Sequence, residues 1–360
     1  MRVYSIGIMR AWIPILVSAA VVAACAPARA QDPAAFYRNK SIDLHIGYSV
    51  GGGYDQYARL IGLSMGKHIP GNPKIVAKNM PGAGSLKLAN WLYAVAPKDG
   101  TAFGTIGRGI PMEPLLGGEG VQFDAQKFTW IGSANDEVSI CAAWKTSGIT
   151  KFEDLYTKEL IVGGTGSGAD TDIFPIVVNK VFGAKFKVIS GYPGGNDINL
   201  AMERGEVAGR CGWSWSSVKS SHMHWVKDGT IRLLTQMSLA KHPDLPDVPL
   251  LTDLAKTQEQ KQILELIFAR QVMGRPFLAP PGLPADRAEA LRTAFMKTMK
   301  DPEFVAAADK AQLEITPVSG ADIEILVKQV YATPPDVVKD RKSTRLNSSH
   351  IQKSRMPSSA

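Results

Sequence analysis

Ser49 has the sequence surroundings of a hydrolase nucleophile. Residues 47–51, GYSVG, match the G-x-S-x-G pattern, in which a sharp strand-to-helix turn exposes the serine for attack on a carbonyl group. That chemistry also needs an acid and then a histidine further along the chain, and a helix directly after the turn. Here three consecutive glycines, Gly51 to Gly53, follow instead, and no downstream histidine stands in a neighbourhood typical of a base. A serine hydrolase is therefore the less favoured interpretation.

The favoured interpretation is a binding site built mainly from backbone groups. Four glycine-rich turns each follow a strand-like segment and precede a helix-like one, at residues 48–55, 79–85, 163–172 and 191–197. In open α/β sheets the ligand lies beyond the carboxyl ends of the strands, where helix N-termini offer unpaired N–H groups and a partial positive charge. We therefore expect these turns to bind a small carboxylate. The alternative is that each glycine only serves its own turn.

The side chains of these turns fit the same chemistry, because hydroxyl and amide groups donate hydrogen bonds to a carboxylate. Ser85 fits helix capping equally well, and Asp170 and Asp197 are interpreted mainly as helix-start residues that complement the dipole. No catalytic residue, metal ligand or cofactor is predicted. The predicted ligand-binding residues are Tyr48, Ser49, Gly51, Gly52, Gly53, Asp55, Pro81, Gly82, Ala83, Gly84, Ser85, Thr165, Gly166, Ser167, Asp170, Tyr192, Gly194 and Asn196.

Two aromatic-rich segments downstream are interpreted as structural. Trp213 and Trp215 alternate along a strand-like stretch, so at most one should face a cleft. His222 and His224 are two residues apart, unlike the i, i+4 pair of a helical metal site, which predicts a solvated turn.

The two ends of the chain are set apart from the fold. Residues 1–30 combine arginines, the apolar run WIPILVSAAVVAACA and a final A-x-A sequence, which is typical of a secretory signal. A lipoprotein box ending at Cys25 is a second interpretation, which would anchor the protein at a membrane. Residues 340–360 resemble the translation of a sequencing adapter, and the alternative is a disordered basic tail.

Most of the positive charge lies in these two ends. The whole chain has a formal charge of +8, to which the first segment contributes three and the last a net four. The body is left with about +1, so the charge gives no evidence for nucleic-acid binding.

The body alternates strand-like and helix-like segments, which predicts parallel-rich sheets flanked by helices, over a length sufficient for two domains. Cys141 and Cys211 lack the spacing of a zinc site. In an oxidising compartment they could pair, or stay two separate buried thiols. The predicted strands are 41–49, 73–80, 101–107, 128–135, 139–144, 159–166, 186–192, 207–213 and 230–237, and the predicted helices are 54–69, 85–96, 170–183, 196–206, 285–301 and 302–311.

The order of motifs from about Tyr37 to Val338 resembles the receptors of the tripartite tricarboxylate transporter family, the Bug-type periplasmic solute-binding proteins. The matching segments are GYSVGGGYDQYAR, KNMPGAGSLKLANWLYAVAPKDGT, FTWIGS, GGTGSGADTD, GYPGGNDINLAMERGEVAGR, HPDLPDVPLL and PFLAPPGLPADRAEALRTAF. The resemblance implies a type II-like periplasmic-binding-protein fold, with an α/β domain on each side of a ligand cleft. It also implies capture of a small carboxylate in the periplasm by a monomer that is not an enzyme. Delivery would be to a transporter with one large and one small membrane subunit.

The resemblance assigns the carboxylate to residues 48–55, 81–85 and 165–170. No proline precedes the first glycines and no histidine follows Gly166-Ser167, so the ligand itself does not carry over. A sensor that reports binding to a signalling partner would show the same motifs and is the alternative. We expect the chain to enter its second domain near Glu137 and return near Arg232. The predicted domains are 31–136 with 233–339, and 137–232.

Overall fold

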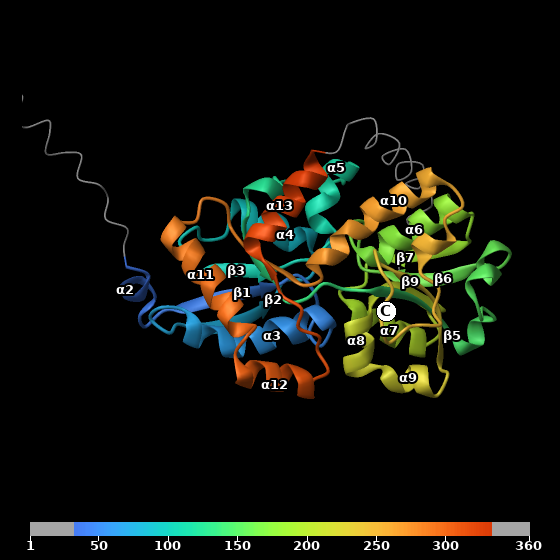
Figure 1. The fold of residues 1–360 in the computed structure, drawn as a ribbon, viewed down its shortest axis with the longest axis horizontal. Coiled ribbons are helices and arrows are strands. Elements are labelled where there is room, and N and C mark those ends of the chain that lie inside the picture. Colours follow the sequence, from blue (N-terminus) through green and yellow to red (C-terminus); the bar gives the residue numbers. More distant parts are fainter. Residues whose placement is uncertain (1–31, 333–360) are drawn as a thin grey trace, which may run out of the picture.

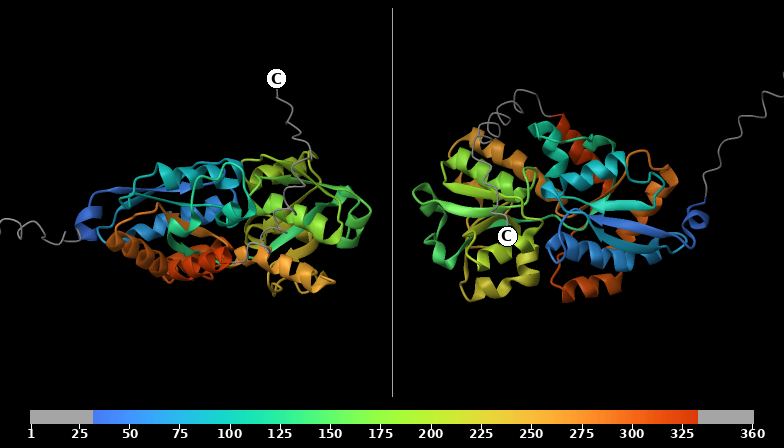
Figure 2. Two further views of the ribbon diagram at one scale, coloured as in Figure 1. Left: turned by 90° about the horizontal axis from the view of Figure 1, so that it is seen from above. Right: turned by 180° about the vertical axis from the view of Figure 1, so that it is seen from behind.

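The computed structural model describes residues 32–332, which form two lobes lying side by side, each built around its own sheet (Figures 1 and 2). The predictions for the signal segment, the lipoprotein cysteine and residues 340–360 concern parts of the chain outside this range. Among the described residues, no helix has the length and apolar character needed to cross a membrane.

The first lobe contains a six-stranded sheet with the order β11-β4-β10-β3-β1-β2. β1 pairs in parallel with both β2 and β3, whereas β10 and β11 run antiparallel to their neighbours. Its strands are β1 (Ser41–Ile46), β2 (Lys74–Asn79), β3 (Ala102–Thr105), β4 (Thr129–Ser133), β10 (Pro276–Ala279) and β11 (Val318–Ser319).

Helices cover both faces of this sheet, because each has an apolar stripe to bury. In α3 the stripe includes Tyr57, Ile61 and Met65, four residues apart, which pack with α11 and α12 against one face. α4 and α13 pack against the other face. The helices are α2 (Pro33–Tyr37), α3 (Gly53–Met65), α4 (Leu86–Ala94), α5 (Glu113–Leu116), α11 (Ala285–Thr298), α12 (Pro302–Lys310) and α13 (Gly320–Tyr331).

The second lobe repeats this plan around a five-stranded sheet with the order β7-β6-β8-β5-β9. α6 and α10 pack on one face, and α7, α8 and α9 on the other. α6 ends at Gly183 with a φ of 71°, which confirms the predicted glycine stop. The elements are β5 (Ser139–Trp144), β6 (Leu160–Gly164), β7 (Phe186–Ser190), β8 (Gly209–Ser214), β9 (Ile231–Met237), α6 (Asp170–Phe182), α7 (Gly195–Glu203), α8 (Trp215–Ser221), α9 (Met223–Lys227) and α10 (Gln258–Phe268).

Between residues 32 and 332 the chain passes from one lobe to the other twice. The first passage, between β4 and β5, contains Glu137, the predicted crossing point. The predicted return near Arg232 differs from the structure, because Arg232 lies inside β9, whose pairing with β5 holds it in the second sheet. α10 also packs in the second lobe, so the chain returns between α10 and β10. The pairing of β9 with β5 keeps this part of the chain in the second lobe, because a strand that left the sheet would lose its backbone hydrogen bonds.

The sheets are mixed, which the alternating element pattern did not indicate. β5 runs antiparallel to β8 and β9, while β6 is parallel to β7 and β8. The carboxyl ends of the parallel strands in each lobe nevertheless carry the glycine-rich turns. Helices α8, α9, α10 and α13 and strands β10 and β11 had no sequence prediction.

Cys141 in β5 and Cys211 in β8 are joined by a disulfide between neighbouring strands of the second sheet. Both cysteines are fully buried, so the bond lies in the core under α6. Of the two alternatives for these cysteines, a disulfide or two separate buried thiols, the structure shows the disulfide.

Replacing both cysteines by alanine should lower the free energy of unfolding by about 2–5 kcal/mol, because the bond closes a long loop in the unfolded chain. Denaturant unfolding of the wild type and the double variant measures the difference. In wild-type protein made in an oxidising compartment and then denatured, thiol labelling followed by peptide mass analysis should leave Cys141 and Cys211 unmodified until reductant is added. Labelling without reductant would contradict the pairing.

Candidate ligand-binding site

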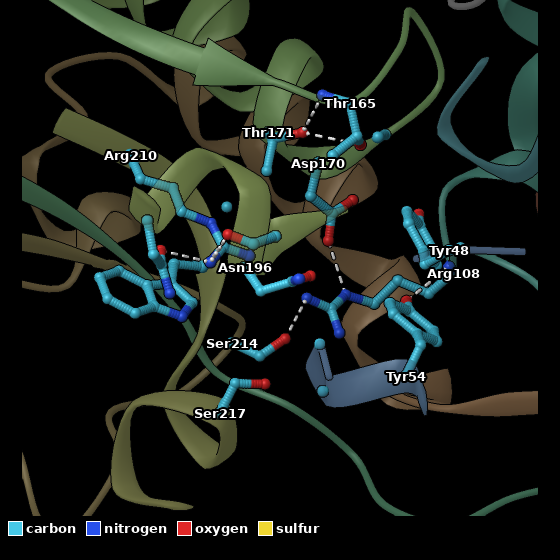
Figure 3. Close-up of a pocket in the computed structure, with 18 of the residues that line it drawn as sticks. Tyr48, Tyr54, Arg108, Thr165, Asp170, Thr171, Asn196, Arg210, Ser214 and Ser217 are labelled. Atoms are coloured by element: carbon cyan, nitrogen blue, oxygen red, sulfur yellow. Dashed lines mark hydrogen bonds and ion pairs between the residues drawn. The ribbon is translucent and has the colours of Figure 1, made fainter. Parts of the chain in front are cut away.

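A cavity lies between the two lobes, where the turns at the strand ends meet (Figure 3). The first lobe contributes the turns after β1 and β3, including Tyr48, Gly51 to Gly53 and Arg108. The second lobe contributes the turns after β6 and β7 and the end of β8, including Thr165, Asn196 and Trp213. Residues far apart in the sequence therefore share one site.

Three helices begin at this cavity without a side-chain cap. The residues before α3, α6 and α7 are Gly52, Ala169 and Gly194, and none provides a capping oxygen to its helix. Gly51 to Gly53, Ala169 and Gly195 line the cavity. The free N–H groups and the dipoles of these helices make the site favourable for an anion.

Ser49 is not arranged as a nucleophile. Its hydroxyl donates to Asp197 Oδ2 at 2.5 Å and lies 3.1 Å from Asn196 Oδ1. Its backbone N–H donates to Pro193 O at 3.2 Å. These partners belong to the opposite lobe and include no imidazole that could accept the proton. Ser49 therefore connects the lobes, and the hydrolase interpretation has no geometric support.

Close packing in this connection depends on Gly194. A Cβ atom at this position would lie 2.2 Å from Ser49 Oγ, so any larger residue would push the two turns apart. Asn196, on the same turn, donates to Val50 O at 2.9 Å and lines the cavity. Tyr192 is buried in the apolar cluster of the second lobe. Three predicted ligand-binding residues of these two turns do not line the cavity: Ser49, Tyr192 and Gly194.

A second connection joins the predicted turns at 81–85 and 165–167. Gly84 N donates to Thr165 O at 2.8 Å, and a Cβ on Gly166 would lie 2.4 Å from the backbone of Ala83 and Gly84. Ser85 Oγ accepts from Gly107 N at 2.7 Å. Of these two turns only Thr165 lines the cavity; Pro81, Gly82, Ala83, Gly84, Ser85, Gly166 and Ser167 do not.

Asp55 lies outside the cavity lining and is buried in a local network. It accepts hydrogen bonds from Gly51 N at 2.9 Å and from Asn79 Nδ2 at 2.8 Å, and it pairs with Arg59 at 2.9 Å. Despite burial, these hydrogen bonds, first that from Arg59, lower the pKa of Asp55. Asp55 therefore fixes the turn that presents Gly51 to the cavity.

Asp170, interpreted from the sequence mainly as a helix-start residue, forms a buried ion pair across the lobes. Its Oδ2 accepts from Arg108 Nε at 2.6 Å (Figure 3). Its Oδ1 lies 3.5 Å from Arg270 Nη1. Arg108 also donates to Gly274 O, Ser139 Oγ and Ser214 Oγ, at 3.0, 3.0 and 3.1 Å. Arg108 is almost fully buried. The sequence did not indicate its ion pair, because Asp170 lies 62 residues further along the chain.

Arg275 is the second buried arginine of the cavity lining. Its Nη2 lies 3.2 Å from Glu137 Oε2, and its guanidinium donates to Ser214 Oγ at 3.0 Å. The guanidinium also lies over the ring of Tyr54, 4.7 Å from its centre. It therefore joins the two chain passages, one near Glu137 and one near Arg275 itself.

Arg210 is the third lining arginine, and a β-bulge brings it to the cavity. Two residues of β8, Cys211 and Gly212, stand opposite Cys141 alone, and Gly212 has a φ of 62°. The extra residue places Arg210 and Trp213 on one face, where the guanidinium lies 4.8 Å from the indole centre. Simple alternation would have placed these two side chains on opposite faces, so sequence reasoning did not find Arg210.

The interpretation of Trp213 and Trp215 as alternating strand residues is wrong in one respect. β8 ends at Ser214, and Trp215 begins α8. Both indoles are buried, but only Trp213 lines the cavity. Strand alternation therefore does not decide where Trp215 points.

The prediction of a solvated turn at His222 is also wrong, because His222 is partly buried and lines the cavity. Arg210 Nη1 donates to Asn199 Oδ1 at 2.9 Å, so the amide nitrogen of Asn199 faces His222 Nε2 at 3.1 Å. Burial, followed by the charges of Arg210 and His224, lowers the pKa of His222 to about 4. His222 is therefore neutral at neutral pH and adds no charge to the cavity.

Comparison with solved structures finds the same architecture. The chain superposes on the periplasmic binding protein BugD with a TM-score of 0.70 at 18% identity, covering 86% of this chain and 98% of that one. Rpa4515 of R. palustris with adipate gives 0.66 at 18% identity, covering 84% and 97%. MatC from Rhodopseudomonas palustris with bound malate gives 0.66 at 17% identity, covering 83% and 99%. No family model matches the chain, and no curated protein matches it in sequence.

The fold is therefore that of the two-domain periplasmic binding proteins, which confirms the fold class predicted from the sequence. The likeness to BugD and to a TctC solute-binding protein from Polaromonas supports, at the level of the fold, the resemblance to Bug-type receptors. The two compared proteins are a periplasmic binding protein and a solute-binding protein, in keeping with the arrangement around Ser49.

The carboxyl group of Asp172 gives the turn at 165–167 a dependence on pH. Asp172 accepts from Gly166 N at 3.0 Å, and burial raises its pKa from 3.8 to about 6. Between about pH 4 and 6 the folded protein therefore holds a proton that the unfolded chain has released. The stability that this proton provides is complete below pH 4 and is lost as the pH rises to 6.

Asp172→Asn should remove this dependence. Between pH 4 and 7 the wild type should lose roughly 2–3 kcal/mol of unfolding free energy relative to the variant, since one pKa unit corresponds to about 1.4 kcal/mol. Denaturant unfolding of both proteins at several pH values measures the difference, from which the other titrating groups cancel. A constant difference across this range would contradict a raised pKa.

Proposed function

We propose that this protein is an extracytoplasmic solute-binding receptor that captures a small carboxylate between its two lobes. The observation that carries the proposal is the meeting of three uncapped helix N-termini, those of α3, α6 and α7, at one cavity. Each provides backbone N–H groups and a partial positive charge, so an anion there is stabilised from both lobes.

The charges of the cavity lining support the same ligand class. Arg108, Arg210 and Arg275 line it, whereas Asp170 is the only acidic residue of the described chain that does. A buried arginine binds a carboxylate with two parallel hydrogen bonds. A cavity whose lining has a net positive charge favours an acid over an amine. Two structurally similar proteins carry adipate and malate, which are themselves carboxylates.

The cellular role follows the motif resemblance. We propose that the receptor works in the periplasm and delivers its ligand to a tripartite tricarboxylate-type transporter with a large and a small membrane subunit. Ligand binding would hold the lobes together, because both lobes contribute donors to one ligand, so the closed form has the higher affinity. Connections such as Gly84 N to Thr165 O would then form on closing.

A ligand panel tests the proposal. Thermal unfolding of the purified protein should show a raised midpoint with at least one mono-, di- or tricarboxylate or aromatic acid, because a ligand that binds only the folded state stabilises it. Gly166→Val should weaken that binding at least ten-fold, or about 1.4 kcal/mol, because its side chain would separate the turns at 81–85 and 165–167.

Gly205→Val is the matched control. Gly205 also has a positive φ, of 74°, but a Cβ added there would meet nothing within 4 Å, so this variant adds backbone strain without entering the contact between the lobes. It should bind the acid as the wild type does. No rise in midpoint with any acid, or equal loss of binding in both variants, would contradict the proposed receptor.

A further inference from the structure

A second groove between the lobes lies outside the ligand cavity and contains a cluster of charged side chains. The cluster consists of Lys219, His242 and Asp244 of the second lobe and Glu314 of the first. None of the four is among the residues that line the cavity. The groove also borders both passages of the chain between the lobes. A change in this cluster therefore acts on the arrangement of the lobes without touching a bound ligand.

Glu314 is the member of the cluster that joins the lobes. Its carboxylate pairs with the ammonium group of Lys219, and its Oε1 lies 3.0 Å from His242 Nε2. The backbone N–H of Asp244 donates to His242 Nδ1 at 3.0 Å, so the ring proton is on Nε2 and the neutral imidazole donates to Glu314. Lys219 also pairs with Asp244 at 2.8 Å, so its charge lies between two carboxylates.

Each side of this contact is fixed in its own lobe. The residues on either side of Glu314 pack in the core of the first lobe, and its carbonyl oxygen accepts from Tyr57 Oη of α3 at 2.9 Å. In the second lobe, the backbone N–H of His242 donates to Oε1 of the buried Gln236 in β9 at 2.8 Å. A hydrogen bond near 3 Å is lost when its atoms shift by about one ångström. The contact therefore belongs to the closed arrangement of the lobes.

The charge of Glu314 depends on the same contacts. The ionisable groups that face it are Lys219 of α8, His242 and Asp244 of the segment after β9, and Tyr57 of α3, while Asp136, Glu137 and Lys241 line the same groove. Despite burial, the hydrogen bonds from His242 and Lys219 lower the pKa of Glu314 from its ordinary value of 4.5. In an open form without these partners the pKa returns toward 4.5. Ionised Glu314 therefore stabilises closure above pH 4.5, and this stabilisation is lost as the pH falls toward the lower pKa of the closed form.

We propose that Glu314, Lys219 and His242 form a latch outside the ligand cavity that holds the lobes closed and that acid releases. Their side chains are only 25, 22 and 13% exposed, and charges in a partly buried network attract more strongly than an isolated surface pair. The latch raises the affinity for a ligand by increasing the fraction of the protein that is closed. It rests on the proposed function only in requiring that the lobes open and close, since it needs no particular ligand.

Hydrogen exchange of the ligand-free protein tests the latch, because two backbone hydrogen bonds outside the cluster also join the lobes. Ser49 N donates to Pro193 O at 3.2 Å, and Gly84 N donates to Thr165 O at 2.8 Å. Opening exposes both N–H groups to water, so their exchange rate follows the population of the open form. At pH 7, Glu314→Gln should speed the exchange of both amides at least three-fold, while the amides of α11 exchange as in the wild type.

Glu303→Gln is the matched control. Glu303 pairs with Lys67 at 2.6 Å, but both residues belong to the first lobe and Glu303 is exposed. This variant should leave the exchange of both reporting amides unchanged. Lys219→Gln removes the other side of the latch and should act in the same direction as Glu314→Gln. Because the two residues share one contact, the double variant should change exchange by less than the product of the two single effects.

The dependence on pH isolates the charge of Glu314. At a given pH the chemical exchange rate of an amide is the same in both proteins, so the ratio of Glu314→Gln to wild type reports only on opening. Between pH 7 and pH 4 this ratio should fall at least two-fold, because the wild type loses a charge that the variant lacks at every pH. A constant ratio would overturn the release by acid.

The outcomes separate the latch from the receptor function. Unchanged exchange at Ser49 and Gly84 in both Glu314→Gln and Lys219→Gln would overturn the latch. Equal acceleration in α11 would overturn it too, because it would report unfolding of the whole protein. Either result leaves the receptor in place, since the ligand panel tests that function. Faster exchange in Glu314→Gln, with no acid of the panel bound, would support the latch and overturn the carboxylate receptor.

Discussion

The burial of guanidinium charge between two lobes is the constraint on which this structure depends. A buried cation is costly unless it is paired and hydrogen-bonded, and Arg108 and Arg275 find their carboxylate and hydroxyl partners across the cleft. Ser214, at the end of β8, accepts from both arginines. Separating the lobes would break these contacts in one step, so the arginines couple the shape of the cavity to the closed arrangement.

Glycine makes that closed arrangement sterically possible. Gly166 lies against the backbone of Ala83 and Gly84, and Gly194 lies against Ser49. In both places a Cβ would take the space that the opposite lobe occupies. Several glycines that suggested ligand contact in the sequence therefore serve contact between the lobes, while Gly51 to Gly53 and Thr165 line the cavity itself. Both roles use the same property, which is close approach of bare backbone.

The periodic elements and the glycine-rich turns could be predicted because their signals are local. The apolar spacing in α3 and α6, the glycine stop at Gly183 and the buried runs of β1 and β6 all act over a few residues. The return of the chain to the first lobe was predicted too early, near Arg232, because the partners of β9 lie far away in the sequence. The roles of Arg108, Arg210 and Arg275 were missed for the same reason.

The sequence by itself determined the fold class, the place of the turns at strand ends, and the small-residue character of the predicted site. These follow from periodicity and from the backbone freedom of glycine, which each segment carries with it. Only the tertiary structure decided which charges face the cavity. The bulge at Cys211 and Gly212 turns Arg210 toward Trp213, and Asp170 meets Arg108 from the opposite lobe. The energy of a charge depends on its neighbours in space, and here those neighbours come from distant parts of the chain.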